Sequence, residues 1–252
     1  AAGAHLVRSD DRFGIATVQS DPSEDDAATM RRLRAEPNVA YVLHDRVVSA
    51  ERLHLRTAPD TFSVVIGTKP NSAPYDTYYT STPQGWAVQQ VGGYGDNVPG
   101  APAHGPWDIT KGKGVRIAIL DSGVDETHPD IAPNLALNLS EVDQTAYPSA
   151  CDDGSPRDQQ GHGTWTASLA AGAMGPGSGQ VIGVAPEATI LNIKVLERLP
   201  TAMNGASLAD ECSAGQASGL LSWVLEGIND AIVNRADIIS LSVGAVADMT
   251  TG

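Results

Sequence analysis

Two residues of the sequence, Asp121 and His162, have the types and surroundings that acid–base chemistry needs. Asp121 directly follows the apolar run Val115–Leu120, and in parallel α/β sheets ligands bind at the carboxyl ends of such strands. His162 lies between two glycines, which allow the backbone to approach a neighbour closely. A carboxylate followed by a histidine 41 residues later suggests a carboxylate that orients an imidazole. The pair would also suit a metal ion, although no His-x-x-x-His motif or cysteine cluster stands nearby.

The elements that must position these two residues follow from the apolar pattern. Nearly continuous apolar runs indicate buried parallel strands, and small or periodically apolar stretches between them indicate helices. The sequence predicts strands at Val115–Leu120, Thr189–Leu196 and Ile238–Val243, and helices at His162–Ala173 and Gly219–Ala236. This alternation predicts a doubly wound, mainly parallel α/β sheet.

The first 55 residues are expected to form a small α/β unit of their own. Alternating apolar and polar residues predict a strand at Arg12–Gln19, and the run Asp21–Glu24 predicts a helix start with arginines in the last turn. A run rich in Val and Tyr predicts a strand at Val39–Val48. Residues 56–112 are rich in Pro and Gly, so regular structure should be sparse there.

Composition excludes some classes of function. The net charge is −14, and residues 121–252 carry most of it, with 17 acidic against 4 basic side chains. Such a surface repels phosphate backbones, so nucleic acid is not an expected partner. No apolar run reaches the ~18 residues of a membrane span, so no membrane partner is expected. The two cysteines, Cys151 and Cys212, are predicted to form a disulfide, with two separate thiols as the alternative.

Five blocks in a fixed order resemble the subtilisin-like serine protease family, peptidase family S8. The block Ile117–Asp125 resembles the family's Asp motif, and Gly161–Thr164 resembles its His motif. Three further blocks resemble the segments that follow in the family: Ile182–Pro186, Ile193–Leu196 and Asp237–Gly244, the last being its substrate-cleft strand. The resemblance covers roughly residues 85–244.

The resemblance implies a role for each matching residue. Asp121 would orient the imidazole, and His162 would serve as general base and then general acid. An extended substrate would pair with two backbone segments, Ser213, Ala214 and Gly215 on one side and Ser242, Val243 and Gly244 on the other. Asp130 matches a position that binds calcium in many relatives, so a structural calcium is considered there, whereas the chemistry itself needs no cofactor.

The segments Glu36–Val42 and Asp45–Val48 resemble the end of subtilisin-type propeptides. We therefore expect residues 1–55 to be an inhibitory propeptide domain, residues 56–84 a linker with the processing region, and residues 85–252 the first part of a catalytic domain. The tail after Val48 would enter the substrate cleft. The alternative is an accessory domain packed away from the cleft.

The family's nucleophilic serine and oxyanion-hole asparagine have no counterpart among the 252 residues. We expect a serine endopeptidase that acts on proteins or peptides, inactive as this chain alone and completed by a C-terminal remainder carrying the Ser and the Asn. That remainder could be a separate chain or could be missing by truncation, and a naturally non-catalytic relative is the third explanation. In that last case the function would be that of a peptide-binding or inhibitory pseudoprotease. The resemblance and the paired cysteines suggest a secreted protein.

Overall fold

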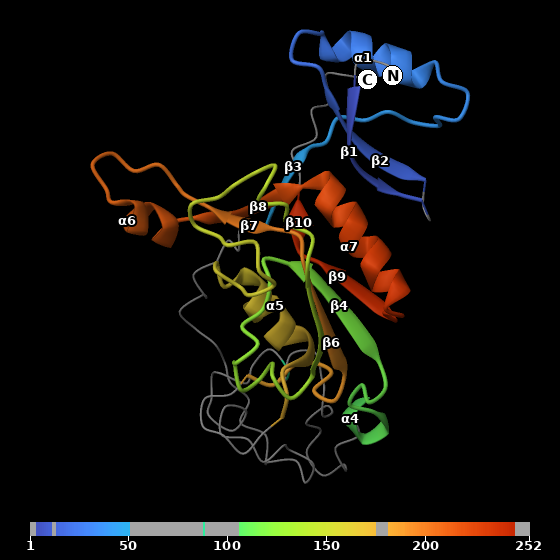
Figure 1. Cartoon of the computed structure of the whole chain (residues 1–252). Helices are drawn as coiled ribbons and strands as arrows, with labels where there is room; N and C mark the ends of the chain where they lie inside the picture. The colour runs from blue at the N-terminus through green and yellow to red at the C-terminus, as the bar shows by residue number, and fades with distance from the viewer. Residues whose placement is uncertain (1–3, 12–13, 51–87, 89–105, 175–180, 245–252) are drawn as a thin grey trace, which may run out of the picture.

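A computed structural model describes residues 4–11, 14–50, 88, 106–174 and 181–244 (Figure 1). Its centre is a four-stranded sheet in the order β5-β6-β4-β9. The strands are β4 (Arg116–Asp121), β5 (Leu135–Ser140), β6 (Thr189–Lys194) and β9 (Ile238–Leu241), and all the pairings among them are parallel. The predicted parallel sheet is therefore confirmed, and β5 is a strand that the sequence pattern did not reveal.

The two faces of β4 pack against different helices, because successive side chains of a strand point to opposite faces. Ala118 and Leu120 belong to the apolar cluster that includes Trp223 and Val224 of α7 (Leu221–Val233). Ile117 and Ile119 belong to a second cluster with Ala167 and Ala171 of α5 (His162–Ala171). A helix on each face confirms the doubly wound α/β arrangement expected of a subtilisin-like fold.

The N-terminal residues form an antiparallel hairpin with a helix. Strands β1 (Ala4–Asp10) and β2 (Ile15–Ser20) pair with each other, and α1 (Asp26–Arg34) follows. The helix begins after Asp25, whose carboxylate accepts a hydrogen bond from the Ala27 amide. The predicted start at Asp21–Glu24 was too early, because the Asp21 side chain instead closes a turn by accepting from the Ser23 amide at 2.8 Å.

A second sheet joins the N-terminal residues to the rest of the chain. Its order is β10-β3-β8-β7, with β3 (Val47–Ala50) antiparallel to both β8 (Gln216–Leu220) and β10 (Val243–Gly244). Two short helices and one strand complete the described elements: α4 (Pro106–Ile109), α6 (Leu208–Ser213) and β7 (Glu197–Leu199). The strand predicted at Val39–Val48 is thus wrong over most of its length, since only Val47 and Val48 of it lie in a strand.

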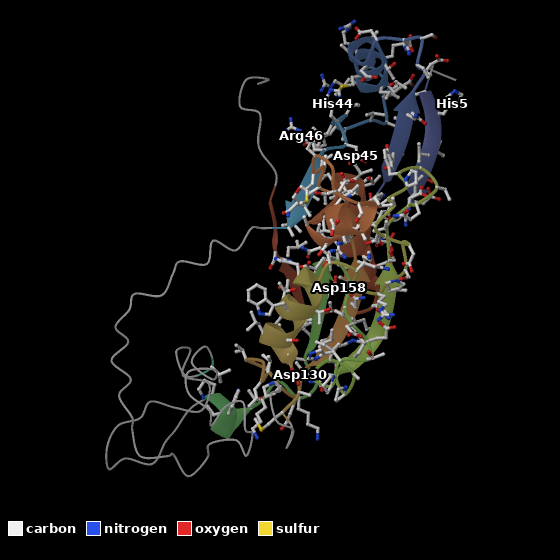
Figure 2. All side chains as sticks on the ribbon, turned by 90° about the vertical axis from the view of Figure 1, so that its left-hand side faces the viewer. His5, His44, Asp45, Arg46, Asp130 and Asp158 are labelled. Carbon is white, nitrogen blue, oxygen red and sulfur yellow. A yellow bond between two sulfur atoms is a disulfide. The ribbon has the colours of Figure 1, made fainter. Side chains whose placement is uncertain are left out.

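The coil before β3 contacts the start of α7 (Figure 2). The Leu221 amide donates to the Arg46 carbonyl at 2.8 Å, and the Ser222 amide donates to the Asp45 carboxylate at 2.9 Å. A carboxylate at a helix N-terminus stabilises the helix because it accepts from amides that have no partner inside the helix. Residues 45–50 therefore bind to the rest of the chain through both a cap and a strand.

Candidate active site

Asp121 is the last residue of β4, and its side chain is 1% exposed. Its backbone carbonyl accepts from the amides of Val195 and Leu196, which follow β6. Its carboxylate accepts from the next amide, that of Ser122, at 2.7 Å. Hydrogen bonds thus hold both the backbone carbonyl and the side chain of Asp121. The carboxylate lies at the carboxyl edge of the sheet, as the sequence pattern predicted.

His162 is the first residue of α5, and its ring lies against Asp121. The Nδ1 atom is 2.8 Å from Oδ1 and 2.9 Å from Oδ2 of that carboxylate. With Asp121 ionised, the neutral imidazole carries its proton on Nδ1, so Nε2 is the nitrogen that can accept a proton from a third group. The structure therefore brings the two predicted residues together as a carboxylate–imidazole pair.

The two glycines beside His162 serve different purposes. A Cβ added to Gly163 would lie 2.1 Å from the carbonyl oxygen of Gly123, so only glycine lets α5 approach the turn after β4 this closely. Gly161 has no atom within 4 Å of such a Cβ, but its φ of 105° is one that other residues rarely adopt. The expectation of a close backbone approach holds for Gly163 and is wrong for Gly161.

Asp158 holds the start of α5, and the sequence analysis missed it. One carboxylate oxygen accepts from the amides of Gln160 and Gly161 at 2.9 and 2.7 Å, and the other accepts from the Thr164 amide at 2.9 Å. Ser122 donates its hydroxyl proton to Asp158 and accepts from the Gly163 amide. The Asp158 and Ser122 side chains thus connect the residue after Asp121 to the start of the helix that begins with His162. The residue directly before the helix is Gly161, which has no side-chain cap, so a search for Ser, Thr, Asp or Asn at that position does not find Asp158.

Thr166 is a second residue that the sequence analysis did not assign to the site. Its hydroxyl lies 3.2 Å from Asp121 Oδ2 and 3.0 Å from the Gly163 carbonyl. It follows His162 by four residues, one turn of helix, so it shares the face that carries the imidazole. The four-residue spacing from His162 is the feature of the sequence that could have indicated Thr166 as a site residue.

The loop that leads to His162 rests on a buried ion pair. The Lys194 ammonium is completely buried, and it donates to the Asp152 carboxylate at 2.8 Å, to the Gln159 side chain at 2.6 Å and to the Arg157 carbonyl at 3.0 Å. Lys194 also stands beside Asp121 in the register of β6 with β4. A buried cation with three acceptors fixes its partners strongly, because any lost partner would leave charge unpaired away from water.

The predicted disulfide is present. Cys151 and Cys212 are bonded, with 5.4 Å between their Cα atoms and a sequence separation of 61. The bond joins the loop that contains Asp152 to α6, just before β8. It therefore ties the approach to His162 to the second sheet.

The segment β3 of the chain itself lies extended between two strands, β8 and β10. Val48 lies opposite Gly219 of β8, and Gly244 of β10 lies opposite Ser49. The Val48 side chain is 4% exposed and belongs to the same apolar cluster as Ala217.

One side of that arrangement was predicted a few residues too early. Ser213 is the last residue of α6, Ala214 caps it, and Gly215 is buried just before the strand, so Ser218–Leu220 of β8 is the part that pairs with β3. The capping box at Ser207 and Asp210 starts α6 and takes Ser213 into a helix. On the other side Val243 and Gly244 form β10 as expected, and Ser242 lies between β9 and β10.

Asp130 links two stretches of the described chain. Its carboxylate accepts from the Val181 amide at 2.6 Å, and its carbonyl accepts from the Ala173 amide at 2.8 Å, so it links Ala173 to Val181. Figure 2 shows Asp130 well away from Asp158. Across the described residues no group of three or more His, Cys, Asp or Glu side chains converges on a metal position. The calcium considered at Asp130 stays a prediction, because calcium also takes backbone carbonyl and amide oxygens as ligands and residues 175–180 lie outside the described part.

Comparison with known proteins decides the family. A sequence model described as the subtilase family matches residues 112–251. The chain belongs to this family. It is 34% identical over 164 residues to an intracellular serine protease of Paenibacillus polymyxa, covering 64% of this chain and 42% of the relative. It is 29% identical over 225 residues to subtilisin E of Bacillus subtilis, covering 89% of this chain and 42% of that protein. Thermitase of Thermoactinomyces vulgaris is 34% identical over 138 residues, which are 55% of this chain and 40% of thermitase.

This subtilase chain spans about two fifths of the length of these relatives. The matched region contains the Asp121–His162 pair, the Lys194 ion pair and the strands β8 and β10. Family membership thus agrees with the resemblance drawn from the sequence blocks.

Proposed function

We propose that this chain supplies the acid–base half of a subtilisin-type serine endopeptidase. The observation that carries the proposal is the hydrogen bond between Asp121 and Nδ1 of His162. His162 Nε2 takes the proton of a serine hydroxyl as that oxygen attacks the peptide carbonyl, and Asp121 stabilises the imidazolium that forms. His162 then gives the proton to the leaving amine. The serine and an oxyanion-hole asparagine belong to residues outside these 252, so the chain alone is inactive.

The proposed substrates are proteins or peptides that bind in extended form between β8 and β10. Main-chain pairing with two strands tolerates many sequences, so the substrate side chains that enter apolar pockets determine selectivity. The position of Val48 in an apolar cluster supports a preference for an aliphatic side chain at the equivalent place of a substrate.

We further propose that residues 1–55 act as an inhibitory propeptide. The pairing of β3 with both β8 and β10 supports this role, because a tethered strand faces its site at a high effective concentration. We also propose that the protein is secreted, because it has a disulfide and such bonds persist in oxidising compartments. Relatives carry both intracellular and extracellular names. No described helix is long and apolar enough to span a membrane.

The test of the catalytic proposal combines the chain with the polypeptide encoded downstream of Gly252. The mixture should hydrolyse a labelled protein and react with a fluorophosphonate, whereas the 252-residue chain alone should do neither. His162→Ala should lower kcat by at least about a thousandfold. His128→Ala is the matched control, because His128 lies in another turn, where its ring accepts from the Asp130 amide.

Cleavage that survives His162→Ala would refute the catalytic role. The same mixture tests the alternative of a peptide-binding pseudoprotease, which the occupancy of the β8–β10 gap by β3 favours. In that case an extended peptide would bind without being hydrolysed, and no fluorophosphonate adduct would form.

A further inference from the structure

An arginine of the N-terminal hairpin meets three carboxylates of the catalytic part. Arg8 of β1 donates through Nη2 to Oε2 of Glu141, just after β5, at 2.5 Å. Its Nε lies 3.5 Å from Oε1 of Glu226 on α7. Asp230, one turn further along α7, also attracts the guanidinium. We call Glu141, Glu226 and Asp230 the acidic trio.

Glu141 and Glu226 of the trio are largely shielded from water, which makes the contact different from an ordinary surface ion pair. The Glu141 side chain is 7% exposed and that of Glu226 is 11% exposed, whereas Arg8 is 44% exposed. Burial and the neighbouring Asp230 raise the pKa of Glu141 to about 7, and Arg8 acts in the opposite direction. Removing Arg8 would leave close, poorly hydrated carboxylates without this cation, a larger loss than an exposed pair would suffer.

The other contacts that join residues 4–50 to the rest of the described chain involve no arginine paired with carboxylates. Strand β3 is held mainly by backbone pairing and by the burial of Val48, and Asp45 accepts from Ser222 at the start of α7. The trio lies in the part of the chain that holds 17 acidic and 4 basic residues, so a cation on the hairpin is the complementary group.

We propose that the acidic trio is a docking surface that recognises a guanidinium on the N-terminal unit, and that Arg8 is the residue by which this unit is selected and held. The partner is residues 4–50 of the same chain, bound at the trio as well as at the β3 site. The inference concerns docking and does not require the chain to be a protease. It goes beyond the proposed propeptide role because it names a recognition site away from the substrate strands.

Hydrogen–deuterium exchange on the whole chain tests the proposal. Arg8→Glu should speed exchange at residues 47–50 and 221–222 by about tenfold or more, because docking and exchange protection at these amides are coupled. Exchange in β4 and β6 should stay unchanged. Arg31→Glu changes the net charge equally on the exposed surface of α1 and should alter exchange less than twofold.

A charge reversal adds a rescue. The double variant Arg8→Glu/Glu141→Arg restores an opposite-charge pair and places the new arginine beside Glu226 and Asp230, so exchange should return to within about threefold of the parent chain. The proposal is overturned if Arg8→Glu behaves like Arg31→Glu, or if the double variant exchanges as fast as Arg8→Glu. Faster exchange throughout β4 and β6 would also overturn it, because Arg8 would then serve the fold of the whole chain.

Discussion

The Asp121 carboxylate contacts three groups of different kinds. A backbone amide from Ser122, the Nδ1 of His162 and the hydroxyl of Thr166 all lie within 3.2 Å of its oxygens. The amide belongs to the backbone, and the imidazole is a member of the proposed catalytic pair. The hydroxyl is the one of these three groups that a substitution can remove while leaving the other two in place. Thr166 is therefore the residue through which the orientation of Asp121 can be probed without removing either member of the pair.

We expect Thr166→Val to lower kcat/KM of the reconstituted enzyme by about fivefold to tenfold, because one hydrogen bond to the carboxylate is lost in a nearly isosteric side chain. Thr166→Ser, which keeps the hydroxyl, should retain most of the activity. The nitrogen-15 chemical shifts of the His162 ring in the chain alone give an independent measurement. They should change in Thr166→Val because a less firmly oriented carboxylate alters the hydrogen bond at Nδ1. Equal activity of the Val and Ser variants would contradict the proposed role.

At the scale of elements, strands and helices with a buried apolar face were predictable, and those that depend on distant partners were not. The apolar runs at β4 and β6 and the helix face of α7 required no knowledge of their neighbours. The coil before β3 has a strand-like composition, yet Tyr41 is 86% exposed and Leu43 is 75% exposed. A strand forms only where a ladder partner exists, and Val47–Ala50 finds such partners about 170 to 195 positions further along the chain.

The candidate site was predictable in part for the same reason. Asp121 and His162 stand at the ends of elements, where the sequence pattern places them. The anchoring side chains Asp158 and Thr166 act through contacts between a loop, a strand end and a helix, and a single sequence gives only their spacing. The edge segment was placed too early because the capping box of α6 was not recognised.

The approach of α5 to the turn after β4 yields a prediction about that helix as a unit. Gly163→Ala should move α5 away from Gly123 and destabilise the fold by about 3 kcal/mol or more, because the new methyl group meets a backbone oxygen. Gly161→Ala should cost only about 1 kcal/mol, the strain of a positive φ. Urea unfolding of both variants measures the difference. Similar losses would show that the glycines act alike.

At the scale of the molecule, ionisation of a buried glutamate makes stability depend on pH. Burial, with a contribution from Asp152, raises the pKa of Glu197 from 4.5 to about 7. A raised pKa means that the folded chain holds this proton more tightly than the unfolded chain. The stabilisation is complete below about pH 4.5 and is lost as the pH rises through 7. Glu141 acts in the same direction.

Glu197→Gln removes this titration. Its free energy of unfolding relative to the parent chain should rise by about 2 kcal/mol between pH 5 and pH 8, and Glu141 should account for part of the remaining slope. Denaturant unfolding at a series of pH values measures the trend. Glu187→Gln, a substitution at an exposed side chain, should run parallel to the parent. A Glu197→Gln curve that also runs parallel would remove Glu197 as the cause.

The central place of β3 in the second sheet also bears on aggregation. Strands β8 and β10 do not pair with each other in the described sheet, so each satisfies one row of amide and carbonyl groups through β3. Without residues 47–50, both rows become open strand edges that face one gap. Open edges are templates for strands of other molecules, and in a concentrated solution a second copy can add there. The four residues of β3 therefore cover two strand edges, one on β8 and one on β10, at which other copies of the chain could add.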